Sequence, residues 1–128
     1  MPAIKQFKDV SETELEIMEV LWKLENPIAS ADLLTYFNNE RQKGWKIQTI
    51  STFLSRLTDK GLVKSKYKGR GALYYPAISY EEYNQVKARS ILEVMYDGSI
   101  KNFFVALYGD KKLTNDEVAE LKKWLSER

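Results

Sequence analysis

The sequence predicts a mainly α-helical protein that carries one small β-hairpin. At 128 residues the chain has the size of one domain, or of a small domain with an accessory element. With 44% hydrophobic and 12% aromatic residues, it can bury a real core. Three Ser/Thr-x-x-Glu capping boxes mark helix starts, and two alternating segments flank a glycine-containing turn. The boxes pair Ser11 with Glu14, Ser79 with Glu82, and Thr114 with Glu117.

The first two helices are expected over residues 12–25 and from about residue 30 to 39. The first carries Leu15, Met18, Leu21 and Trp22 at helical spacing. Asn26-Pro27 ends it, because the residue before proline disfavours helical geometry. Ser30 is expected to cap the second helix. The buried side of that helix comprises Leu33, Leu34 and Phe37.

The third helix is expected over 47–60, where Gly61 stops it. At 100° per residue, its apolar residues fill one arc of about 120°. That arc comprises Ile47, Ile50, Phe53, Leu54 and Leu57. The opposite side is short, hydrogen-bonding and poor in acids: Gln48, Thr52 and Ser55, flanked by Thr49, Ser51 and Arg56.

Residues 62–68 and 72–78 read as two strands around a turn at 69–71, where glycines supply unusual backbone angles. Alternation puts Leu62 or Val63 near the core, together with Tyr67. It places three lysines along one shared edge: Lys64, Lys66 and Lys68.

Three further helices are expected near residues 80–96, 99–109 and 115–126. Their apolar side chains exceed what three short helices bury alone, so this region packs either on the first domain or on a second copy. We therefore divide the chain into a domain at 1–78 and a helical dimerisation region at 79–128. The candidate dimer contacts are Ile91, Leu92, Met95, Phe103, Phe104, Leu107, Leu121 and Leu125.

Charge is strongly segregated along the chain, although the total is only +2. Residues 9–40 hold eight acids against one base, and residues 41–70 hold nine bases against one acid. The absence of Cys and His removes disulfides, thiolate metal sites and the commonest general base, so we expect no enzyme activity and no cofactor or metal. No apolar run is long enough to span a bilayer, and we expect a cytoplasmic protein without membrane insertion.

Three helices followed by a basic hairpin are the order of a winged helix-turn-helix, in which the third helix enters the major groove of DNA. Polar residues on that helix can bond base edges, and cations neutralise phosphates. Each feature alone also has a structural explanation without function. The polar face of the helix could simply be solvated, and the lysines could prevent aggregation through the edge strand. A basic hairpin that meets an acidic protein partner is the rival function. The candidate DNA-binding residues are Lys46, Gln48, Thr49, Ser51, Thr52, Ser55, Arg56, Lys64, Lys66, Lys68 and Arg70.

The segments "ELEIMEVLWKLENPIASADLL" and "WKIQTISTFLSRLTDKGLVKSKYKGRGALYYP" resemble the penicillinase and methicillin-resistance repressor family, which has copper-responsive relatives. The resemblance covers nearly the whole chain. It implies a homodimer in which each winged helix binds half of a palindromic DNA operator. It also implies that Thr49 and Thr52 lie at the DNA, while Gln48 stands where the family often has Lys and Ser51 where Arg is common.

The resemblance further implies a proteolytic switch, in which a membrane sensor leads to cleavage of the repressor at an Asn-Phe bond. Ala106-Leu107 occupies that position here, and an Asn102-Phe103 pair lies four residues earlier. Copper-responsive members bind metal through Cys-x-Cys pairs, which this chain lacks. The operator sequence and the inducing signal stay open.

Overall fold

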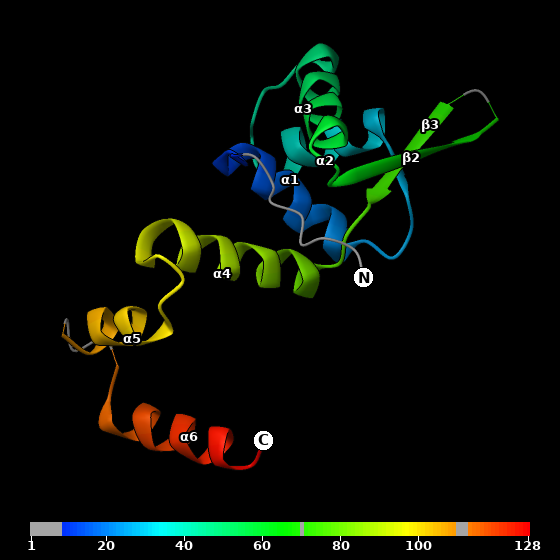
Figure 1. Cartoon of the computed structure of the whole chain (residues 1–128). Coiled ribbons are helices and arrows are strands. Elements are labelled where there is room, and N and C mark those ends of the chain that lie inside the picture. The colour runs from blue at the N-terminus through cyan, green and yellow to red at the C-terminus, as the bar shows by residue number, and fades with distance from the viewer. Residues whose placement is uncertain (1–8, 70, 110–112) are drawn as a thin grey trace. The chain divides into compact units, whose positions relative to one another are not determined.

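The computed structural model describes residues 9–69, 71–109 and 113–128, and its mainly helical architecture with a small sheet confirms the predicted fold class. Figure 1 shows the elements in chain order. They are α1 (Glu12–Lys23), β1 (Ile28–Ala29), α2 (Ser30–Glu40), α3 (Ile47–Asp59), β2 (Val63–Lys68), β3 (Gly71–Pro76), α4 (Tyr80–Tyr96), α5 (Ile100–Gly109) and α6 (Asn115–Ser126). The chain forms two compact units that divide between Val86 and Lys87, inside α4.

The starts of α1 and α2 differ in how they are capped. The Ser11–Glu14 capping box is present at α1, which ends at Lys23 rather than at residue 25. The expectation that Ser30 caps α2 is wrong, because Ala29 is the N-cap residue and no side chain bonds the first turn. The cause is β1: Ala29 is held extended by its pairing with β3, so Ser30 is already helical.

The predicted hairpin forms the larger part of a three-stranded antiparallel sheet of order β1-β3-β2. β2 pairs with β3 from Val63 opposite Pro76 to Lys68 opposite Gly71. The sequence analysis missed β1, which is only two residues long and follows Pro27. This strand ties the start of α2 to the middle of β3, where Ile28 and Ala29 lie opposite Tyr74 and Leu73.

The core lies between the three helices and the base of the hairpin. Its buried side chains are Ile17, Met18, Val20, Leu21, Leu33, Phe37, Ile50, Leu54, Leu57, Leu62, Val63 and Tyr83. Trp22 packs beside it, where its indole N–H donates to the Ile78 carbonyl at 2.9 Å and its ring contacts Tyr80 and Tyr83. The first turns of α4 therefore belong to the core of the N-terminal unit.

Two residues that were expected at the core lie in solvent. Ile47 is 44% exposed, because Trp45 packs between Phe37 and Phe53 and fills that end of the core instead. Tyr67 is 80% exposed. Figure 1 shows the hairpin of β2 and β3 extending past the helices, and every residue of β2 after Val63 is exposed.

The unit from residue 87 onward consists of the rest of α4 with α5 and α6. A complete Thr114–Glu117 capping box opens α6. The rings of Tyr96 and Phe103 meet edge to face at a centroid distance of 5.4 Å. No described residue in this unit is buried, and Met95 and Leu125 are 69% and 55% exposed. Within this unit, the apolar side chains of these helices thus remain largely uncovered.

Candidate nucleic-acid interface

The outward face of α3 is a continuous polar surface with one apolar residue at its start. A shallow hollow of about 410 Å³ runs over Ile47, Gln48, Ser51, Thr52, Ser55 and Arg56. The Thr52 hydroxyl donates to the Gln48 carbonyl at 2.8 Å, so its oxygen keeps lone pairs that can accept a hydrogen bond. Thr49 is only half-buried. Five of the predicted DNA-binding side chains are therefore grouped on one accessible surface.

The wing, here the hairpin of β2 and β3, carries its lysines on one face. Lys64, Lys66 and Lys68 lie opposite Tyr75, Leu73 and Gly71, and all three lysines are exposed. Since alternate residues of a strand point to the same face, these cations form a row along the ribbon. Gly69 in the turn has a φ of +67°, which favours glycine. Arg70 lies outside the described residues.

Acids of α1 neutralise part of the basic block. Glu16 pairs with Arg41 at 2.9 Å and with Lys43 at 3.0 Å. The hydrogen bond from Arg41 is the main reason that the pKa of Glu16 is lowered, and the same contact raises the pKa of Arg41. Glu14 takes Lys60. The cations of residues 41–69 that have no ion-pair partner among the described residues are Lys46, Arg56, Lys64, Lys66 and Lys68.

These five cations are the ones that lie at the start of α3, on its outer side and along the wing. The segregation of charge in the sequence thus has two parts. One part consists of ion pairs within the protein, which connect α1 to the loop before α3 and to the end of α3. The other part faces solvent and produces a positive field over α3 and the wing. Arg41, Lys43 and Lys60, which form these ion pairs, are not among the predicted DNA-binding residues.

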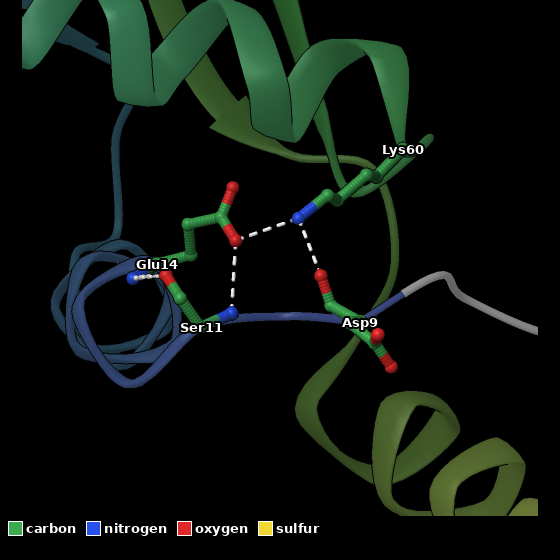
Figure 2. A network of polar contacts seen from close by, with 4 residues as sticks. All are labelled: Asp9, Ser11, Glu14 and Lys60. Carbon is green, nitrogen blue, oxygen red and sulfur yellow. Dashed lines mark hydrogen bonds and ion pairs between the residues drawn. The ribbon is translucent and has the colours of Figure 1, made fainter.

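A buried network holds the C-terminal end of α3 against α1 (Figure 2). The Lys60 ammonium group at the end of α3 donates to Glu14 Oε1 at 2.6 Å and to the Asp9 carbonyl at 2.5 Å. The Ser11 N–H donates to the same Oε1 at 2.9 Å. Glu14 is only 3% exposed, and its Oε2 accepts no hydrogen bond in the described structure.

The charged state of Glu14 depends on this network. Burial of the carboxyl is the largest single effect and would raise its pKa, but the hydrogen bonds from Lys60 and Ser11 together outweigh it and lower the pKa. The N-terminal end of α3 is held separately: Asn38 donates to the Trp45 carbonyl at 2.9 Å and accepts from the Trp45 N–H at 2.8 Å. Both ends of α3 are therefore fixed to α1 and α2.

The described residues contain no group of three or more carboxylate side chains placed to hold a metal ion. Among these same residues, no helix is long and apolar enough to cross a membrane.

Comparison with known proteins confirms the resemblance drawn from the sequence. The family model described as the penicillinase repressor matches residues 10–127. The penicillinase repressor of Bacillus licheniformis is 30% identical over 124 residues, which cover 97% of this chain and 94% of that protein. The methicillin resistance regulatory protein MecI of Staphylococcus aureus is 24% identical over 120 residues, or 94% of this chain and 95% of that one. The solution structure of the DNA-binding domain of the repressor BlaI is 32% identical, with a TM-score of 0.50, and covers 65% of this chain and 94% of that domain.

Proposed function

The chain belongs to the penicillinase repressor family, and we propose that it represses transcription as a homodimer that binds a palindromic DNA operator. The observation that carries this proposal is where the free charges lie: the cations of residues 41–69 that have no ion-pair partner among the described residues lie on α3 and the wing, and α3 also carries the outward hydrogen-bonding groups. DNA is the ligand that matches such a surface, because it presents phosphates along the groove that admits a helix. The proposed location is cytoplasmic.

In the proposed complex, α3 lies in the major groove. Gln48, Thr49, Ser51, Thr52 and Ser55 face the base edges and the adjacent phosphates, and the methyl group of Thr52 is suited to contact with a thymine methyl. Lys46 and Arg56 flank this surface, and the wing lysines meet neighbouring phosphates. The helix supplies sequence preference and the wing supplies affinity.

The proposed dimer forms through the region after residue 78. Its support is the uncovered apolar surface: Ile91 is 38% exposed, Met95 and Leu125 are more exposed still, and Leu92, Phe103, Phe104, Leu107 and Leu121 are only half-buried. A single winged helix covers one half-site, whereas a dimer engages two at high effective concentration.

The proposal includes release of the repressor by proteolysis in α5, through a protease linked to a membrane sensor. Its support is the alignment with the family, which puts Ala106-Leu107 at the cleavage position. In this structure Ala106 is exposed and Leu107 half-buried, both within a continuous helix. Cleavage there separates α6 from the rest of the chain and removes part of the proposed dimer contact.

The direct test is selection of bound fragments from random duplex DNA by the full chain, followed by gel-shift titration of the enriched duplex. We expect an inverted repeat with its half-sites about one helical turn or a multiple apart. Enrichment of no common sequence, together with binding to an acidic polypeptide, would instead support the interaction-module function.

A further inference from the structure

Tyr67 is the one described wing residue whose environment contradicts its sequence pattern. It lies on the strand β2, is 80% exposed, and has no ring contact with any described residue. A single exposed tyrosine needs no explanation by itself. Its position on the ribbon, however, distinguishes it from an isolated surface aromatic.

The two faces of β2 differ in what they meet. Val63, Ser65 and Tyr67 lie opposite Pro76, Tyr74 and Ala72, and therefore share the face away from the lysine row. Val63 belongs to the same core cluster as residues of α3, so this face is turned toward the helices at its base. Ser65 is already exposed, and Tyr67 lies about 13 Å beyond Val63 at the usual strand rise.

The ring of Tyr67 is thus held on the α3 side of the wing, beyond the point where protein covers that side. Its cross-strand neighbour is the small Ala72, so the ring stands clear of the ribbon. Lys66 and Lys68 flank it in the chain and project from the opposite face. In the proposed complex, a duplex that receives α3 in its groove passes along this side of the ribbon.

We propose that Tyr67 is a DNA-contacting residue that packs its ring against the deoxyribose of the backbone beside the groove occupied by α3 and donates its hydroxyl to a phosphate. This inference rests on the proposed function. It adds an uncharged contact to a wing that otherwise holds DNA by cations. An aromatic ring with a polar tip suits a surface that alternates apolar sugar and charged phosphate. Because Tyr67 carries no charge, its contact releases no counterion.

The test compares the full-length wild type with Tyr67→Ala, Tyr67→Phe and Lys66→Ala on two duplexes, one enriched by the wild type from random DNA and one of mixed sequence. Affinities are measured by fluorescence anisotropy over a series of salt concentrations. Tyr67→Ala is expected to weaken binding to both duplexes by about tenfold, the loss of an apolar contact and a hydrogen bond to a charged group, with an unchanged salt slope. Tyr67→Phe is expected to fall between the wild type and Tyr67→Ala.

Lys66→Ala is the matched control from the neighbouring position, and it is expected to reduce the salt slope by about one. Thermal unfolding of Tyr67→Ala should match the wild type, because the side chain is exposed. Equal affinity of Tyr67→Ala and the wild type on both duplexes overturns this inference while leaving the proposed function intact. A loss confined to the enriched duplex also overturns it, because the ring would then read a base. Failure of the wild type to bind either duplex removes the proposed function itself.

Discussion

Removal of Lys60 tests how strongly the buried network holds α3. In Lys60→Met the side-chain length is retained, while the Glu14 carboxylate, 3% exposed, loses the only cation that it contacts among the described residues. Breaking a buried ion pair from one side costs about 3 to 5 kcal/mol, and the partial exposure of Lys60, 20%, places the expected loss near about 3 kcal/mol. The matched variant Glu14→Gln keeps an acceptor for the Ser11 N–H and leaves Lys60 bonded to Asp9, so we expect a loss of about 1 kcal/mol.

The destabilisation caused by Lys60→Met should depend on pH. In the wild type the pKa of Glu14 is lowered, so its contribution to stability is present above the unfolded-state pKa and is lost as pH falls through the folded-state pKa. Removal of Lys60 raises that pKa, because the burial then acts with less opposition. A protonated Glu14 no longer needs the cation. The difference in stability between wild type and Lys60→Met should therefore be largest near neutral pH and shrink toward about pH 4.

The assay is urea unfolding followed by tryptophan fluorescence, which Trp22 and Trp45 report from the N-terminal unit. The double variant Glu14→Gln/Lys60→Met should recover part of the loss of Lys60→Met, because no buried charge remains. A destabilisation by Lys60→Met that is the same at both pH values, or a double variant as unstable as the sum of the two single variants, would refute the reasoning.

Three further predictions concern DNA. Thr49→Ala and Thr52→Ala should each weaken binding to the enriched duplex by roughly 1 to 3 kcal/mol with near-normal folding, and equal gel-shift affinities would contradict the assignment of α3. Lys66→Ala should weaken binding to enriched and mixed-sequence duplexes alike, with the order of preference kept in a competition assay, and a changed order would show that the wing reads bases. A chain that ends at Val86 keeps Tyr83 in the core and should be a folded monomer by sedimentation, with affinity for the palindrome reduced about 10² to 10⁴-fold. Undiminished affinity of this shortened chain would contradict the proposed dimer.

The helices could be predicted from the sequence because their signals are local. Ser11 with Glu14, and Thr114 with Glu117, form the capping boxes that the spacing indicated. Gly61 ends α3 with a φ of +81°. The polar face of α3 followed from the positions of its apolar residues, of which Ile50, Leu54 and Leu57 are buried.

What sequence reasoning missed depends on contacts between distant segments. β1 exists because two residues pair with β3, and that pairing displaces the cap of α2 from Ser30 to Ala29. Alternation along the strand predicted that Tyr67 lies near the core. The pattern holds no information on how far along the hairpin the helices cover it. The pairing of Glu14 with Lys60, 46 positions apart, left no local pattern beyond the opposite charges of the two blocks.

The salt dependence of DNA binding tests the central claim most directly. Five cations of α3 and the wing have no ion-pair partner in the part of the chain that the structure describes: Lys46, Arg56, Lys64, Lys66 and Lys68. They predict the release of counterions from about five phosphates per protomer. At about 0.9 per phosphate, the logarithm of the association constant should fall against the logarithm of salt concentration with a slope of about −4 to −5 for each bound winged helix, and twice that for the dimer on its palindrome. A slope near zero, or no binding to duplex DNA at low salt, would contradict the assignment of α3 and the wing as a DNA-binding surface.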